Sequence, residues 1–255
     1  MANVVLVHGM WMGGGIWRNV ADRLRAAGHD VFAPTLTGLG ERVHLARPDV
    51  DLDTHINDVV NLILYEDLRD VVLVGHSYAG IVVEGVADRL PERLARLVYL
   101  DTGPMGDGVA HLDFYSPEGR AYIDGVVAEQ GDGWRLPYPS AGALAEQASL
   151  AGLSDDDLAL MAARATPQPY ETMRQPQQLT RPFAGEYGRV AILCTDGGFT
   201  IAQLRAMIAD GAPAFQQLAA SDWGFHELPT GHWPMLSMPA ETAELLDSLA
   251  AVPAR

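Results

Sequence analysis

The first hundred residues alternate short apolar runs with longer segments in which apolar residues recur every three or four positions. This alternation predicts strands that are joined by amphipathic helices. Residues 71–74 (Val-Val-Leu-Val) include no polar side chain, which indicates a strand buried on both faces. Such βαβ units form a parallel sheet with helices on both faces, so we expect an α/β fold. The expected strands are residues 4–7, 30–33, 71–74 and 97–100, and the expected helices contain residues 17–24, 56–64 (capped by Asp53 or Thr54) and 81–86.

The alternation stops after Asp101 and resumes at the apolar run 190–194. The residues between them carry many prolines and several short helical stretches, without a convincing buried strand. We therefore predict a helical cap that is inserted before the penultimate strand of a mostly parallel sheet. The predicted core comprises residues 1–103 and 187–255, and the predicted cap comprises residues 104–186. The core is expected to end with a helix at 201–208, a strand at 225–228 and a helix at 240–249.

One short motif, Gly75-His76-Ser77-Tyr78-Ala79-Gly80, stands between the expected strand 71–74 and the helix that follows it. A serine in this context, with small residues two positions to either side, is typical of a nucleophile elbow. The tight turn lifts the hydroxyl clear of the strand and directs backbone N–H groups at the reacting centre. Ala79 replaces the second glycine of the motif, and its methyl group is small enough for the turn. We therefore interpret Ser77 as a nucleophile and the Tyr78 N–H as an oxyanion donor.

The first expected strand runs into a glycine-rich loop, His8-Gly9-Met10-Trp11-Met12-Gly13-Gly14-Gly15. Its glycines let the backbone approach the elbow, so the N–H of Met10 is the expected second oxyanion donor. Trp11 either lines the pocket or packs in the core. The glycine spacing differs from the G-x-G-x-x-G of dinucleotide-binding folds. Acyl transfer on a serine requires no metal or organic cofactor, and we predict none.

The base that would activate Ser77 is expected just after the last strand, where His232 stands. This position lies at the same edge of the sheet as the elbow, so the imidazole can accept the serine proton. The acid that orients the imidazole has two candidates, Asp196 and Asp101, and each follows a strand whose end points toward the elbow. The sequence leaves both open. His76, inside the elbow, is expected to line the pocket.

The charge of the chain limits its partners. The formal net charge is −16, and all 17 basic residues are arginines. An acidic surface repels nucleic acid and anionic membranes, so we expect neither as a partner. The absence of lysine excludes Schiff-base chemistry on a lysine, and the single cysteine, Cys194, excludes an intramolecular disulfide. We expect a cytoplasmic protein with a small-molecule ester as substrate, and a homodimer is compatible with the sequence.

These motifs together resemble the α/β-hydrolase superfamily, and more narrowly its branch of plant methyl esterases, hydroxynitrile lyases and bacterial esterases. The similarity is carried by VVLVHGMWMGGGIW (4–17), PTLTGLGER (34–42), LVGHSYAG (73–80), VYLD (98–101) and GHWPML (231–236). The resemblance implies a nucleophile at Ser77, a base at His232, oxyanion donors at Met10 and Tyr78, and a cap that shapes the pocket.

Two positions depart from the pattern of that branch. The acid of the family usually ends a C-T-x-D sequence, but here Gly197 occupies the last position and Asp196 precedes it. In the lyases a lysine follows the base, whereas here the residue is Trp233, which we expect to line the pocket together with Trp11 and His76. The resemblance therefore favours ester hydrolysis over cyanohydrin cleavage.

The leading hypothesis is hydrolysis of a carboxylic ester of an apolar or aromatic small molecule through an acyl-enzyme, and a methyl ester, a lactone or a thioester would fit. Two alternatives stay open. One is a cofactor-free lyase or cyclase that uses the same Ser–His pocket, and the other is a non-catalytic small-molecule binder that retains the fold.

Overall fold

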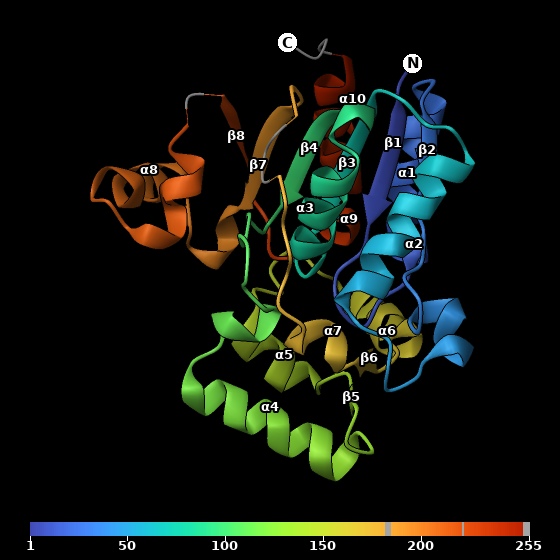
Figure 1. Cartoon of the computed structure of the whole chain (residues 1–255), viewed down its shortest axis with the longest axis vertical. Coiled ribbons are helices and arrows are strands. Elements are labelled where there is room, and N and C mark those ends of the chain that lie inside the picture. Colours follow the sequence, from blue (N-terminus) through green and yellow to red (C-terminus); the bar gives the residue numbers. More distant parts are fainter. Residues whose placement is uncertain (182–184, 221, 252–255) are drawn as a thin grey trace.

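A computed structural model describes residues 1–181, 185–220 and 222–251 of the protein. A six-stranded, entirely parallel sheet forms its centre, with the strand order β2-β1-β3-β4-β7-β8. Figure 1 shows helices in front of this sheet and behind it, so the expected α/β-hydrolase fold is confirmed. The strands are β1 (Asn3–Val7), β2 (Asp30–Phe32), β3 (Val71–His76), β4 (Leu94–Leu100), β7 (Gly188–Cys194) and β8 (Trp223–Leu228).

The apolar pattern of the strands explains why both faces are covered. In β1, Val4 and Leu6 belong to one hydrophobic cluster, while Val5 and Val7 belong to the other. Helices α1 (Arg18–Ala26) and α10 (Pro239–Ala251) pack on the first cluster, and α2 (Leu52–Tyr65) and α3 (Ala79–Arg89) pack on the second. At the edge of the sheet α8 (Ile201–Ala209) contacts β8, and the short α9 (Pro234–Ser237) precedes α10.

The start of α2 differs from the prediction. Its N-cap is Asp51, neither Asp53 nor Thr54. The Asp51 carboxylate accepts a hydrogen bond from the Thr54 N–H at 2.8 Å, which makes Thr54 the third helical residue of a capping box. The segment between β2 and this helix contains a short 3₁₀ helix, Gly40–Leu45. Other 3₁₀ helices are Gly14–Trp17, Pro91–Arg93, His111–Phe114, Thr195–Gly197 and Pro213–Leu218.

The segment between β4 and β7 lies apart from the sheet, below it in Figure 1. It contains α4 (Pro117–Gln130), α5 (Ala141–Gln147), α6 (Asp155–Arg164) and α7 (Glu171–Arg174). It also contains a two-stranded antiparallel sheet, β5 (Arg135–Leu136) and β6 (Gln168–Pro169), whose strands are too short to produce an alternating pattern. Residues 182–184 of the predicted cap lie outside the described residues. Among the described helices, none is both long and apolar enough to cross a membrane.

Candidate active site

Ser77 occupies a sharp turn between β3 and α3. Its φ of +55° lies in the left-handed region that non-glycine residues rarely adopt. The turn is possible because residue 75 is glycine: a Cβ there would lie 2.6 Å from a methyl of Val83 and 2.7 Å from the Ala79 carbonyl oxygen. Ala79 itself is fully buried at the start of α3. The sequence therefore enforces a strained turn that exposes the serine side chain at the end of the strand.

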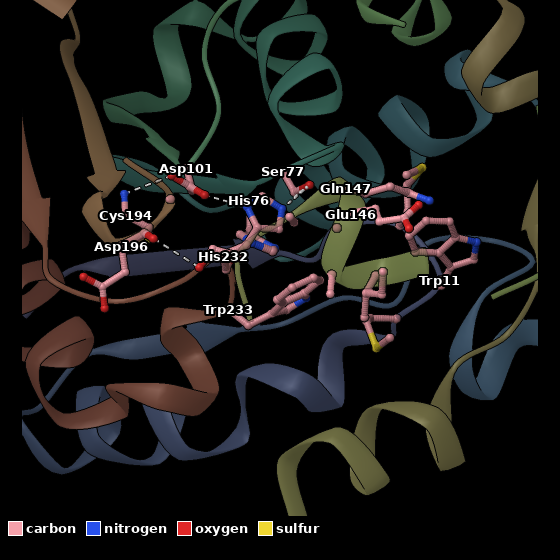
Figure 2. A pocket seen from close by; sticks show the side chains of 18 of the residues that line it. Trp11, His76, Ser77, Asp101, Glu146, Gln147, Cys194, Asp196, His232 and Trp233 are labelled. Carbon is pink, nitrogen blue, oxygen red and sulfur yellow. Dashed lines mark hydrogen bonds and ion pairs between the residues drawn. The ribbon is translucent and has the colours of Figure 1, made fainter. Parts of the chain in front are cut away.

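The side chains of Ser77, His232 and Asp101 form one chain of hydrogen bonds (Figure 2). The Nε2 of His232 lies 2.8 Å from the Ser77 hydroxyl, and its Nδ1 lies 2.5 Å from Oδ2 of Asp101. Because an ionised carboxylate only accepts hydrogen bonds, Nδ1 carries a proton and Nε2 is free to accept one from the serine. This is the arrangement by which a histidine abstracts a serine proton.

Two backbone contacts hold Asp101 at the end of β4. Its second carboxylate oxygen accepts a hydrogen bond from the N–H of Cys194 at 2.9 Å, and its own N–H donates to the carbonyl of Ile192 at 2.8 Å. Burial would raise the pKa of Asp101, but the hydrogen bond and charge of His232 and the N–H of Cys194 outweigh burial and lower it. Asp101 also has a positive φ of +49°. The carboxylate therefore stays ionised in a fixed orientation.

The other candidate acid, Asp196, does not reach His232. It stands in the 3₁₀ turn Thr195–Gly197 and is exposed. Its hydrogen bonds within the described residues involve the backbone: its N–H donates to Thr230 at 3.1 Å, and its carbonyl accepts from the Ser149 hydroxyl at 3.4 Å. Asp196 therefore does not orient the base in this structure, because the turn after β7 carries its side chain to the mouth of the pocket.

Cys194, immediately before this turn, is buried at the end of β7, as the apolar run 190–194 predicts. Burial, with the nearby Asp101 carboxylate, raises the pKa of its thiol. A thiolate nucleophile is therefore not available at this position at neutral pH.

The loop after β1 approaches the elbow closely. A Cβ on Gly9 would lie 3.1 Å from Cβ of Ser77, so a larger residue would press on the serine. Among the described residues no acceptor is found for the N–H of Met10 or for that of Tyr78. These are the two N–H groups that the sequence predicts as oxyanion donors.

A buried imidazole supports this loop from behind. The His8 Nδ1 lies 2.8 Å from the carbonyl oxygen of Gly9, and its Nε2 accepts a hydrogen bond from the N–H of Leu36 at 3.1 Å. Burial lowers the pKa of His8 to about 4, so the ring is neutral at physiological pH. The sequence alone gives no role to His8. Its hydrogen-bond partner Leu36 lies in a distant loop, and no sequence pattern relates the two residues.

Trp11, which follows Met10, ties the same loop to the segment between β4 and β7. Its φ is +63°, its N–H donates to the side chain of Gln168 at 3.2 Å, and its indole N–H donates to the carbonyl of Leu136 at 3.1 Å. The Trp11 ring both lines the cavity and is buried in one of the two hydrophobic clusters. The two interpretations of this residue are therefore compatible.

His76 fixes the backbone of the base. Its Nε2 lies 2.6 Å from the carbonyl oxygen of His232, and the centroids of the two rings are 4.7 Å apart. Burial, followed by the nearby His232 ring, lowers the pKa of His76 to about 3. The ring is therefore neutral, with its proton on the nitrogen that donates to the carbonyl.

These side chains open into a cavity of about 630 Å³. Trp11, His76 and Trp233 line it, in agreement with the prediction. The segment between β4 and β7 adds residues that the sequence does not single out, because no spacing relates them to the elbow. They include His111, Tyr115, Leu144, Glu146, Gln147 and Ser149. Within the residues described, no cluster of histidine, cysteine, aspartate and glutamate suits a metal ion.

The parallel sheet, the serine elbow and the histidine at the last strand define the α/β-hydrolase class. The chain matches the alpha/beta hydrolase family over residues 4–245 and belongs to it. It is similar to the carbendazim hydrolyzing esterase of Nocardioides sp. (strain SG-4G), at 38% identity over 98% of this chain and 100% of that protein. Methylesterase 3 of Arabidopsis thaliana is 25% identical over 97% of this chain and 95% of its own length.

Solved structures of other hydrolases share the fold. An extracellular α/β-hydrolase from a Paenibacillus species superposes with a TM-score of 0.78, at 23% sequence identity, over 99% of this chain and 100% of that one. A pyrethroid hydrolase superposes with a TM-score of 0.69 at 21% identity over 100% and 99% of the two chains. The predicted resemblance to the esterase branch of the superfamily is confirmed.

Proposed function

We propose that this protein is a carboxylic ester hydrolase that works through an acyl-enzyme, with Ser77 as nucleophile, His232 as base and Asp101 as the orienting acid. The observation that carries the proposal is the continuous chain of hydrogen bonds from Asp101 through His232 to Ser77, at 2.5 and 2.8 Å, at the wall of a cavity. The full-length similarity to an esterase at 38% identity supports it.

The geometry gives each group its step. The Ser77 oxygen attacks the ester carbonyl while Nε2 of His232 takes its proton, and the N–H groups of Met10 and Tyr78 stabilise the oxyanion. The imidazolium returns that proton to the leaving alcohol, and Asp101 stabilises its charge. Water, activated by the same nitrogen, then releases the carboxylic acid. Removal of one oxyanion donor typically costs about 10²- to 10³-fold in rate.

We further propose that residues 104–186 act as a cap that shapes the substrate pocket, and that the substrate is an apolar or aromatic ester. Aromatic and aliphatic side chains from both parts of the chain, among them Trp11, Tyr115, Leu144 and Trp233, line the cavity. Relatives named for carbendazim hydrolysis, pyrethroid hydrolysis and methyl ester hydrolysis point in the same direction. Methyl esters, lactones and thioesters are the first compounds to test.

The experiment compares wild type, Ser77→Ala and a matched control, Ser248→Ala, whose serine is exposed on α10. Each is assayed with a short p-nitrophenyl ester, then treated with a serine-directed organophosphonate and weighed intact. We expect turnover and one adduct on Ser77 in wild type and control, and a loss of about 10⁴-fold or more in Ser77→Ala. An adduct without turnover would instead favour a lyase or cyclase. Neither adduct nor turnover would indicate a binder.

A further inference from the structure

Within the described residues, the permanently charged side chains that line the cavity are all of one sign. They are Asp101, Glu146 and Asp196, and no arginine of this part of the chain lines the cavity. The whole chain contains no lysine, so lysine cannot compensate them either. Figure 2 shows Glu146 and Asp196 on opposite sides of the Ser77–His232 pair. The nucleophile therefore opens into a cavity whose wall carries carboxylates.

Two of the three carboxylates are uncompensated. Asp101 is engaged by His232 and Cys194. Within the described residues, the side chains of Glu146 and Asp196 form neither an ion pair nor a hydrogen bond. Glu146 stands in the last turn of α5, which contains no basic residue. A carboxylate at the carboxyl end of a helix adds to the partial negative charge of the helix terminus.

Two other imidazoles that line the cavity, those of His76 and His111, do not neutralise this field. Burial lowers the pKa of His76 to about 3 and that of His111 to about 4, so both rings are uncharged at neutral pH. His111 lines the cavity with only 9% of its surface exposed, and its Nδ1 has no hydrogen-bond partner among the described residues. A buried polar atom of this kind usually has a partner, and the described residues supply none.

The remaining walls favour a cation as well. Trp11, Tyr115, Phe199 and Trp233 line the same cavity. The faces of aromatic rings attract ammonium groups, and the attraction is stronger where water is excluded. A carboxylate in a substrate would find neither an arginine nor a lysine, and it would face two unpaired carboxylates.

We infer that the active-site cavity selects its ester by charge: neutral and cationic esters enter and react, whereas anionic esters of similar size are disfavoured. This inference rests on the proposed ester hydrolysis. It adds a consequence for turnover, because the product acid ionises on release and the same carboxylates repel it. A cleft lined by charges of one sign changes the local concentration of a charged substrate by about tenfold or more.

The test uses three thioacetates that share one acyl group and differ in the charge of the leaving thiol. They are acetylthiocholine, which is cationic, S-neohexyl thioacetate, its uncharged carbon analogue, and acetylthiopropionate, which is anionic. Thiol release is followed with a disulfide reagent, and kcat/KM is measured at low salt and at about 0.5 M salt. We expect kcat/KM for the cation to exceed that for the anion by about tenfold at low salt, and the ratio to shrink at high salt.

The variant Glu146→Gln/Asp196→Asn removes both free carboxylates, and the matched control Glu129→Gln/Asp156→Asn removes two exposed carboxylates that do not line the cavity. The cation-to-anion ratio should fall by about threefold or more in the first variant and stay unchanged in the control. Equal values of kcat/KM for cation and anion in wild type, or equal ratios in both variants, would overturn the inference while the proposed hydrolysis stands. If wild type hydrolyses none of the three, the proposed function fails and takes the inference with it.

Discussion

The two sides of the cavity differ in how their imidazole groups are held. On the side of the sheet, Ser77, Asp101 and His232 hold one another, and His76 holds the backbone of the base. On the other side, which residues 104–186 provide, the Nδ1 of His111 has no partner among the described residues. The sheet side is preorganised before any substrate binds. On the opposite side, the imidazole of His111 is buried without a partner for its Nδ1 among the described residues.

Among the described residues that line the cavity, backbone strain follows the same division. The non-glycine residues with a positive φ are Trp11, Ser77 and Asp101, at 63°, 55° and 49°. Such conformations cost of order 1–3 kcal/mol each and persist only where the surroundings determine them fully. Here those surroundings are the ends of parallel strands and fixed hydrogen bonds. The comparison indicates that the catalytic geometry comes from the ends of the strands, whereas the proposed role in substrate choice falls to residues 104–186.

The largest effect is expected when Asp101→Asn is compared with Asp196→Asn. An asparagine at 101 cannot hold the imidazole in the required tautomer, and we expect kcat to fall by about 10³- to 10⁴-fold. Asp196 lies at the mouth of the cavity, so we expect Asp196→Asn to lower kcat by less than about tenfold with a neutral ester. Steady-state kinetics of the two variants, at equal folded fractions by circular dichroism, measures the difference. Losses of similar size in both variants would contradict the conclusion that Asp101, and not Asp196, orients His232.

The same contrast explains what the sequence can predict. Ser77 and His232 are predictable because the ends of parallel strands must meet at one edge of the sheet, so their positions along the chain fix their positions in space. The choice between Asp101 and Asp196 needs the structure. Both follow strands that end at this edge, and only the turn at Thr195–Gly197 sends Asp196 outward.

The residues of the other side could not be predicted in this way. His111 and Glu146 reach the cavity because short helices and loops, joined by side-chain contacts, happen to bring them there. Their positions depend on packing between distant segments, as in the hydrogen bond between the Trp11 indole and Leu136. No periodic pattern encodes such a contact, and the two-residue strands β5 and β6 are likewise too short to leave one.

A second prediction concerns acid stability. Burial lowers the pKa of His8 and His55 to about 4, and that of His76 to about 3, against an ordinary value of 6.5. The unfolded chain therefore binds more protons than the folded one between these values, and stability is lost as the pH falls from 6.5 toward 4. Glu84 acts in the opposite sense between 4.5 and 7, because burial raises its pKa to about 7. Burial also lowers the pKa of His111 to about 4, and four histidines outweigh one glutamate, so acid destabilises the protein.

Urea denaturation at pH 7.5 and pH 5 measures this effect, and a drop of several kcal/mol is expected, since one pKa unit corresponds to about 1.4 kcal/mol. His8→Asn should be less stable than wild type at the higher pH and lose less on acidification. The control His44→Gln, at an exposed position, should follow the wild-type curve. If acidification lowered the free energy of unfolding of His8→Asn as much as that of wild type, protonation of His8 would not be a cause of the lost stability.

The smallest effect is expected on the opposite side of the cavity, at His111. The His111→Phe variant keeps a ring next to Tyr78 and Tyr115, whose centroids lie 5.4 and 5.8 Å away, and removes the nitrogen that lacks a partner. Because an unsatisfied buried polar atom is costly, the free energy of unfolding should rise by about 1 kcal/mol. For an ester with a hydrogen-bonding group, KM should rise by about threefold while kcat stays nearly constant, since the lost contact is with bound substrate.

Both readouts are needed, because a merely structural histidine would give a different pair of results. If the new phenyl ring filled a site that had only packed the core, KM would not change. If the imidazole were already satisfied in the free protein, for example by a bound water, the variant would be less stable than wild type. The control Tyr122→Phe, at an exposed position on α4, should leave stability and KM unaltered. A gain in stability together with a loss in substrate affinity is what a side chain kept open for a ligand must show.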